Sequence, residues 1–198
     1  IDPVQHHHAH IASCLADNGW PLEAGPVIGV ALDGLGYGLD DSYWGGEFLL
    51  ADYGSFERIA TFRPVALLGG AKAMREPWRN ALAHIVTAIG WQNYFEQYAE
   101  LELTKYFQTK PLATYDSMLK SKQNAPLASS CGRLFDAVAA AIGVCRAEVS
   151  YEGQAAIELE ALVSSNALEE EEEQQAYPFV IENLGKKLPY IDSKTMWQ

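Results

Sequence analysis

The hydrophobic pattern of this chain changes near Pro64, and that change limits its possible folds more than any other feature. Before Pro64, short runs rich in β-branched and aromatic residues alternate with Gly and Asp, which predicts an antiparallel meander with strands at residues 27–32, 42–51 and 56–62. Beyond it, apolar residues recur at helical spacing, which predicts helices at residues 72–89, 91–107, 115–120, 130–142 and 154–168. The order predicts an α/β fold with a sheet part at residues 1–67 and a mainly helical part at residues 68–198.

Four histidines close to the start of the chain predict a metal site. A helix from Val4 to Asp17 would place His6 and His10 about 40° apart on one face, which suits two imidazole ligands of a single ion. Such an ion also needs a carboxylate, and Asp33 follows the first strand. A purification-tag remnant and a solvated or core-satisfied histidine cluster remain open as alternatives.

Asp33 opens a glycine-rich segment that resembles a phosphate-binding turn. Gly34, Gly36 and Gly38 lack a Cβ atom, so their backbone amides can approach a phosphate closely and form an anion nest. Glycine-rich hairpins are common, however, and a hairpin without a ligand is an equally good interpretation of this pattern.

Two arginines spaced four residues apart are candidates for anion binding. If Arg75 and Arg79 share one helix, their guanidinium groups can act together on a phosphate. Ion pairing with Glu76 or another carboxylate is the structural alternative, and Pro77 indicates a kink or a helix start between the two arginines.

The segment at residues 129–137 predicts a helix that opens at a serine N-cap and carries Gly132 and Asp136 on one face. Glycine early in a helix costs about 1 kcal/mol relative to alanine, which suggests that a close neighbour occupies the space. With a sugar as that neighbour, Asp136 would accept hydrogen bonds from a ribose. Helix packing against Gly132, with Asp136 in solvent, is the alternative.

The composition excludes several classes of protein. The net charge of −12 over 198 residues disfavours nucleic acid and anionic membranes as partners. Three cysteines without C-x-x-C spacing, no apolar run of membrane length and no export signal favour a cytoplasmic protein. Because the chain opens without Met, we expect it to be part of a longer polypeptide. The acidic run at residues 169–173 is given no function.

Six blocks, taken in order, resemble the C-terminal, TsaD-like domain of the HypF carbamoyltransferase family of [NiFe]-hydrogenase maturation. They run from Val4 to about Leu162 and read VQHHHAHIAS, ALDGLGYG, YWGGEF, REPWRNAL, GRLFDAVAAAIG and YEGQAAIELE. Antibiotic O-carbamoyltransferases share this domain and are a related possibility. Several long motifs in register are far more specific than any one of them.

The resemblance implies part of an actin-like ATPase (ribonuclease H-like) fold, with iron or zinc held by His6, His10 and Asp33. It implies that Gly132 and Asp136 contact a ribose and that Gly34, Gly36 and Gly38 hold phosphate. A further metal-binding aspartate of the family and its adenine-binding glycine segment have no counterpart in this sequence. The resemblance therefore implies that this chain carries part of the family's ligand set.

The activity implied by the resemblance is carbamoyl transfer from carbamoyl adenylate, made from carbamoyl phosphate and ATP, to the C-terminal cysteine of the partner protein HypE. Arg75 or Arg79 would stabilise the departing AMP, a role that is our hypothesis. A catalytically inactive metal- or nucleotide-binding module is the second possibility. A tRNA-modifying partner protein ranks lower because the net charge disfavours RNA. Histidine and carboxylate ligands do not distinguish iron from zinc.

Overall fold

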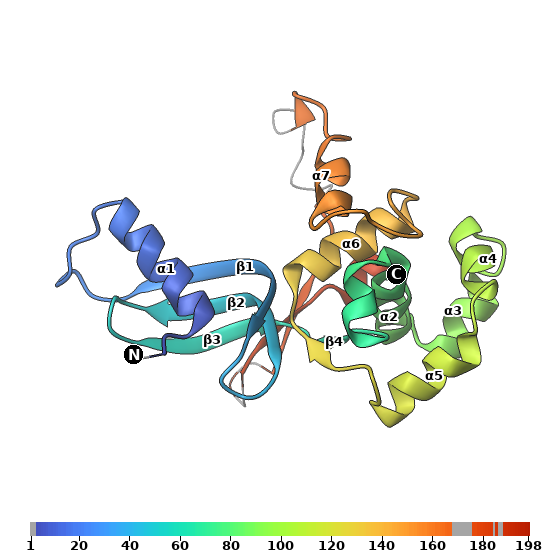
Figure 1. The fold of residues 1–198 in the computed structure, drawn as a ribbon, viewed down its shortest axis with the longest axis horizontal. Coiled ribbons are helices and arrows are strands. Elements are labelled where there is room, and N and C mark those ends of the chain that lie inside the picture. The colour runs from blue at the N-terminus through green and yellow to red at the C-terminus, as the bar shows by residue number, and fades with distance from the viewer. Residues whose placement is uncertain (1–2, 168–175, 184, 186–187) are drawn as a thin grey trace. The chain divides into compact units, whose positions relative to one another are not determined.

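The chain folds into two compact units in a computed structural model that describes residues 3–167, 176–183, 185 and 188–198 (Figure 1). The first unit comprises Ile1–Pro64, Leu127–Cys131 and Val180–Asp192, and the second comprises Val65–Pro126, Gly132–Phe179 and Ser193–Gln198. The predicted division after residue 67 lies close to the first of these boundaries. No sequence pattern indicated the two later segments that belong to the first unit.

A meander of three antiparallel strands forms the sheet of the first unit, as the sequence predicts. Strand β2 pairs with β1 along one edge and with β3 along the other; the strands are β1 (Val27–Tyr37), β2 (Tyr43–Ala51) and β3 (Phe56–Phe62). Distant segments extend this sheet: β5 (Leu127–Ala128) runs parallel to β2, β7 (Tyr190–Asp192) runs parallel to β3, and β6 (Val180–Glu182) runs antiparallel to β7. Segments from the later part of the chain thus complete the sheet of the first unit.

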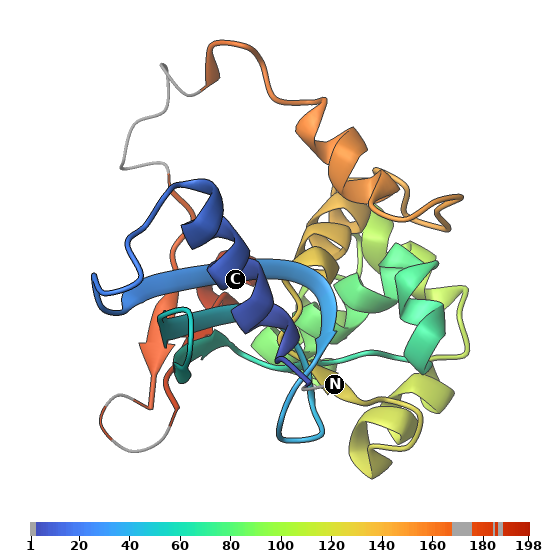
Figure 2. The same ribbon diagram turned by 60° about the vertical axis from the view of Figure 1, so that its left-hand side comes forward.

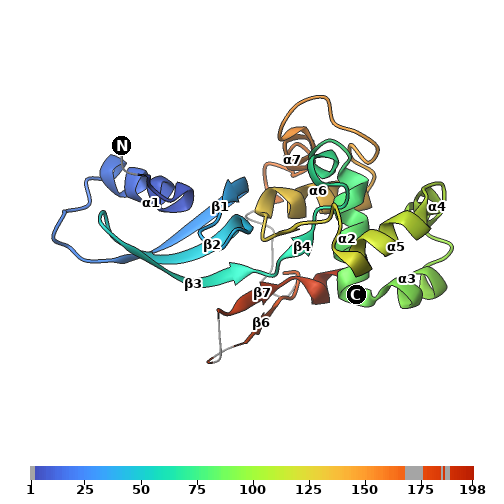
Figure 3. The ribbon, with the colours of Figure 1, turned by 60° about the horizontal axis from the view of Figure 1, so that its bottom comes forward.

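Helix α1 (His6–Asp17) lies on one face of the meander (Figure 3). Its apolar side chains form a small core with β1 and β2, made of Ile11, Leu15, Ala31, Leu49 and Ala51. The contact is close at Gly29, because a Cβ atom at that position would lie 2.3 Å from Cδ1 of Ile11. This packing fixes α1 against β1 and so holds the histidines of its first turns near the strand.

The second unit is mainly helical (Figure 2). Its core is built around α2 (Pro77–Ile89), where Trp78, Ala81 and Leu82 are fully buried. The remaining elements are β4 (Val65–Ala66), η1 (Gly70–Met74), α3 (Trp91–Gln97), α4 (Glu102–Gln108), α5 (Leu112–Ser121), α6 (Cys131–Ala141), α7 (Gln154–Glu160) and η3 (Lys194–Trp197). None of the described helices is both long and apolar enough to cross a bilayer.

Several predicted boundaries were wrong. The helix expected at residues 72–89 is two elements, because Pro77 has no N–H to continue a helix and instead starts α2. The helix expected at residues 91–107 divides into α3 and α4, and α7 ends at Glu160 rather than at residue 168. Residue 168 and the acidic run at residues 169–173 lie outside the described residues.

The irregularity of the sheet opposite Gly45 lies in the facing strand, β1. Between Leu32 and Gly36, β1 carries extra residues against β2, and its backbone presses on Gly45. A Cβ atom at position 45 would lie 2.7 Å from the carbonyl oxygen of Asp33. The glycine therefore accommodates the irregular strand rather than forming the irregularity.

Candidate functional site

Helix α1 presents two of the predicted metal ligands from adjacent turns. The helix begins after Gln5, whose side-chain oxygen caps it by accepting a hydrogen bond from the backbone N–H of His8 at 2.9 Å. Starting the helix there places His6 and His10 one turn apart, with both side chains exposed and their ring centroids 4.5 Å apart. The predicted helical spacing of the two histidines is therefore present.

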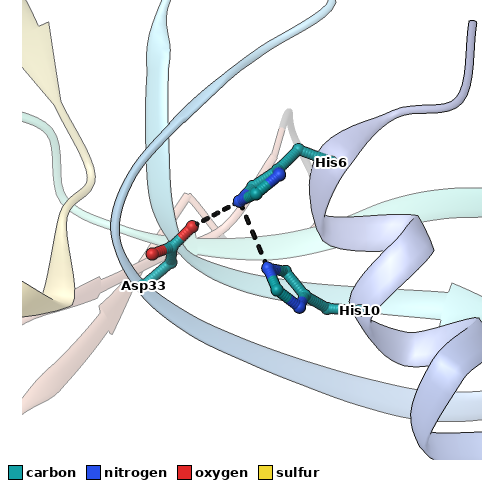
Figure 4. Close-up of side chains that lie close together, drawn as sticks. All are labelled: His6, His10 and Asp33. Atoms are coloured by element: carbon teal, nitrogen blue, oxygen red, sulfur yellow. Dashed lines mark hydrogen bonds and ion pairs between the residues drawn. The ribbon is translucent and has the colours of Figure 1, made fainter.

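Asp33 approaches the two histidines from strand β1 (Figure 4). The change of register after Leu32 is the kind of strand irregularity that turns a side chain out of the regular ladder. The Oδ2 atom of Asp33 lies 2.8 Å from Nε2 of His6, and this nitrogen lies 3.2 Å from Nε2 of His10. Residues 27 positions apart thus meet at one point.

The chemistry of these side chains fits a metal ion. Their ligand atoms all lie within 4.8 Å of one another, and no other such cluster of His, Cys, Asp or Glu occurs in the described part of the chain. Two ligands bound to tetrahedral zinc at about 2.0–2.1 Å are separated by roughly 3.3 Å, close to the observed spacing. Because the side chains of His6 and Asp33 are 48% and 28% exposed, a small substrate can reach the same point.

Hydrogen bonds favour the ionised form of Asp33. Its burial acts to raise the pKa, but hydrogen bonds from His6 and from the backbone N–H of Gly34 outweigh that effect and lower it. The neighbouring His7 has a lowered pKa, first of all because burial removes its ring from water. The cluster therefore combines a carboxylate with a buried, neutral imidazole beside it.

The glycines that follow Asp33 do not form the expected turn. Strand β1 continues to Tyr37, and none of Gly34, Gly36 and Gly38 has the positive φ that an anion nest requires. Two of them instead make room for side chains: a Cβ at Gly36 would lie 2.4 Å from Cε1 of His7, and one at Gly38 would lie 2.2 Å from Nε1 of Trp44. Only Gly34 leaves open space for a ligand.

The structure separates the two arginines that the sequence suggested would act together. Arg79 is buried in α2, donates from Nε to Glu76 at 2.9 Å and stacks over the ring of Trp78. Arg75 follows η1, ahead of the start of α2 at Pro77, and is exposed. The expectation of one shared helix face was wrong, and Arg79 has the contacts of the structural alternative.

A cavity of about 910 Å³ in the second unit is lined by Arg75, Arg133 and Asp136 among others. Asp136 is buried on α6, and its Oδ2 lies 3.0 Å from Nε of Arg133. The two atoms are paired electrostatically without the geometry of a hydrogen bond. Gly132 is the second residue of the same helix and is half-buried, and it is not among the residues that line the cavity. The cavity therefore holds two arginines together with the carboxylates of Asp136, Glu148 and Glu152. Arginines suit a phosphate, and carboxylates suit the hydroxyl groups of a sugar.

The buried carboxyl of Asp136 gives a pH dependence that can be measured. Burial raises its pKa from 3.8 to about 6, although Arg133 opposes the rise. The native state then binds more protons than the unfolded state between about pH 4 and 6, so its free energy of unfolding falls as pH rises through that window, by on the order of 3 kcal/mol.

We expect Asp136→Asn to remove this part of the slope, measured by urea unfolding at successive pH values. Asp17→Asn, which changes an exposed carboxylate on α1, is the matched control and is expected to keep the slope. An unchanged slope in Asp136→Asn would contradict the raised pKa.

The sequence interpretation missed two residues near the histidine–aspartate cluster, Ser130 and Glu47, and one residue of the second-unit cavity, Arg133. Ser130 donates from Oγ to the carbonyl oxygen of Gly34, beside Asp33. Glu47 is fully buried and accepts a hydrogen bond from Ser129 at 2.5 Å. Arg133 stands between Gly132 and Asp136 in one motif, and its spacing of three from Asp136 was a signal that helical periodicity offered.

A family model and curated relatives both match this chain, and they agree on one family. A family model described as "Carbamoyltransferase, Kae1-like Domain, second subdomain" matches residues 29–198. The chain is 47% identical over 161 residues to carbamoyltransferase HypF of Rhodobacter capsulatus, which covers 81% of this chain and 21% of that protein. It is 40% identical over 198 residues to HypF of Synechocystis sp., covering 93% and 24%. The chain thus spans about a quarter or less of these relatives.

Solved structures of HypF proteins are similar over nearly the whole chain. A full-length HypF crystallised in a phosphate- and nucleotide-bound form has a TM-score of 0.74 and 39% identity, and the match covers 98% of this chain and 27% of that one. HypF of T. kodakarensis has a TM-score of 0.76 and 29% identity, with coverage of 98% and 24%. The predicted α/β fold class is confirmed, and the fold is the Kae1-like fold that these structures share.

Proposed function

The chain belongs to the carbamoyltransferase HypF family, and on that basis we propose that it forms part of a site for carbamoyl transfer. The donor is carbamoyl adenylate, made from carbamoyl phosphate and ATP, and the acceptor is the C-terminal cysteine of a HypE partner protein. The observation that carries the proposal is the convergence of His6, His10 and Asp33 on one point that is open to solvent.

These residues would hold an iron or zinc ion. When bound, the ion supplies Lewis acidity toward a carbonyl oxygen of the carbamoyl group. His6 and His10 donate ring nitrogens from a rigid helix, while Asp33 supplies negative charge from the sheet. A buried apolar core packs α1 against β1, so the two histidines on the helix keep their position relative to Asp33 on the strand.

The cavity of the second unit is our candidate site for the nucleotide part of the substrate. Asp136 would accept hydrogen bonds from a ribose, with Gly132 leaving room beside it, and the exposed Arg75 would meet a phosphate of the departing AMP. In the first unit, Gly34, whose surroundings are open, is the one glycine of the Asp33 segment that remains a candidate for contact with a phosphate. The buried and paired Arg79 is not part of this proposal.

Zinc binding to the chain tests the metal centre directly. We expect His6→Ala and His10→Ala each to lower zinc affinity by at least about 100-fold, because each removes one of three ligands. Affinity is measured by competition with a chromophoric chelator. His84→Ala is the control, because His84 is the one histidine outside residues 6–10. It should bind zinc like the wild type.

Transfer is tested separately, with carbamoyl adenylate as the donor and HypE as the acceptor. Loss of both zinc binding and transfer in His6→Ala supports the proposed enzyme. Zinc binding without any transfer by the intact protein would favour the alternative of a binding module. Wild-type affinity for zinc in both alanine variants would contradict the metal centre.

A further inference from the structure

His7 is the buried member of the histidine cluster, and carbamoyl transfer as proposed above assigns it no role. Its side chain is fully shielded from solvent. Its Nε2 atom has no hydrogen-bond partner among the described residues. Such atoms are rare in native proteins, because burial without a partner forfeits hydrogen bonds to water. The carboxylate Oδ2 of Asp33 lies 3.8 Å from this nitrogen, and the carboxylate of Glu47 also acts on the ring electrostatically.

Gln5 determines which nitrogen of the His7 ring carries the proton. Its Oε1 accepts from the backbone N–H of His8 at 2.9 Å, and its Nε2 donates to the carbonyl oxygen of Tyr37 at 3.3 Å. Each of these backbone groups has a single possible role, so the orientation of the Gln5 amide is settled. The same Nε2 lies 3.1 Å from Nδ1 of His7, which must accept. The neutral ring therefore carries its proton on Nε2, toward Asp33.

The surroundings of His7 allow its ring little freedom to turn away. Gly36 lies against it so closely that a Cβ atom there would be 2.4 Å from Cε1 and 2.9 Å from Nε2 of the ring. Trp44 packs on it with a ring-centroid distance of 5.8 Å. A polar ring that is held this firmly, with its donor atom directed at a carboxylate, is arranged to act on that carboxylate.

We propose that His7 is a positioning residue: its Nε2–H orients the carboxylate of Asp33 from the buried side, so that the carboxylate binds the metal ion. The inference rests on the metal centre proposed above. Asp33 already accepts from the backbone N–H of Gly34 at 2.6 Å on its other oxygen. The N-cap residue Gln5 thus holds His7 through its Nδ1 atom, and the opposite nitrogen of His7 lies next to Asp33, the proposed metal ligand. Partners of this kind fix the orientation of metal ligands.

Zinc titration of the full chain, with Zn²⁺ alone as the probe, separates positioning from packing. We expect His7→Leu, which fills the space without a donor, to lower zinc affinity by about 10–100-fold. His7→Gln keeps an amide donor at a similar reach and should restore affinity to within about threefold of wild type. His8→Gln is the matched control, because His8 is also buried but bonds the carbonyl oxygen of Asp52 at 2.7 Å.

A second readout needs no metal. Nitrogen NMR of the His7 ring in the metal-free chain is expected to show the proton on Nε2. A proton on Nδ1, or wild-type zinc affinity in a folded His7→Leu variant, would overturn the inference while leaving the metal centre intact. Equal losses in His7→Leu and His7→Gln would also overturn it, since packing alone would then explain both. Absence of zinc binding by the wild type would overturn the metal centre and the role of His7 together.

Discussion

Replacing Glu47 with Ala is expected to lower the free energy of unfolding by about 3–5 kcal/mol, because it leaves buried partners of a carboxylate without their acceptor. Glu47 is fully shielded from solvent on β2. It accepts from Nε of Arg58 at 2.6 Å and from the hydroxyls of Ser129 and Thr61 at 2.5 and 3.2 Å. Removal of the carboxylate leaves the Arg58 guanidinium, only 14% exposed, next to a cavity. Urea unfolding measures the loss.

Two further variants show whether the ion pair is the cause. Glu57→Ala, which alters an exposed glutamate on the neighbouring strand, should change stability by no more than about 0.5 kcal/mol. Combining Glu47→Leu with Arg58→Met should cost less than Glu47→Ala alone, because neither charge is then left buried without its partner. A Glu47→Ala variant within 1 kcal/mol of wild type would contradict the argument, as would a double variant less stable than the single one.

The carboxylate of Glu47 also bears on the metal centre. Ser129, which donates to Glu47, is followed by Ser130, and Ser130 donates to the carbonyl oxygen of Gly34. Gly34 in turn donates its N–H to Oδ1 of Asp33. A path of hydrogen bonds, joined by the backbone between Ser129 and Ser130 and within Gly34, thus links the buried ion pair to a predicted metal ligand. Loss of Glu47 is therefore expected to weaken zinc binding as well as stability.

The convergence of the three candidate ligands was predictable because it depends on local geometry. The spacing of His6 and His10 fixes their common helix face, and Asp33 stands where a strand pattern stops. The sequence does not distinguish His7 from the other histidines of α1, since its burial depends on how α1 packs on the sheet. The conformation after Asp33 was mispredicted because Gly36 pairs with Trp44 across the sheet, which keeps the backbone extended. Glycine permits a turn there without requiring one.

The parts of the fold that escaped prediction depend on distant contacts. The strands β5 and β7 are two and three residues long, too short for any periodic pattern, and they exist because β2 and β3 offer them an edge. The pairing of Arg79 with Glu76 was weighed as an alternative from sequence, but only the buried environment decides it. Propensity identifies elements, and tertiary packing then sets their ends and partners.

Replacing Gly36 with Ala is expected to lower zinc affinity by at least about 100-fold and to destabilise the chain by about 1–3 kcal/mol. The added methyl would lie 2.4 Å from Cε1 of His7 and 2.7 Å from Cδ2 of His6, both far inside van der Waals contact. His7 is fully buried and unable to retreat, so the first turn of α1 must move. That movement carries His6 away from Asp33, and chelator competition measures the result.

Gly34→Ala supplies the matched control, two residues away on the same strand. A Cβ atom there would meet nothing within 4 Å, and the backbone φ is not in the left-handed region. Zinc affinity and stability should therefore stay close to wild type. The pair also distinguishes two explanations of the glycine-rich segment. If the glycines serve only to let a phosphate approach the backbone, Gly36→Ala should keep the zinc affinity of the wild type, which would contradict our expectation. If Gly36 instead makes room for the histidines of α1, zinc affinity is lost in Gly36→Ala and kept in Gly34→Ala. Any loss of phosphate binding is then expected in Gly34→Ala.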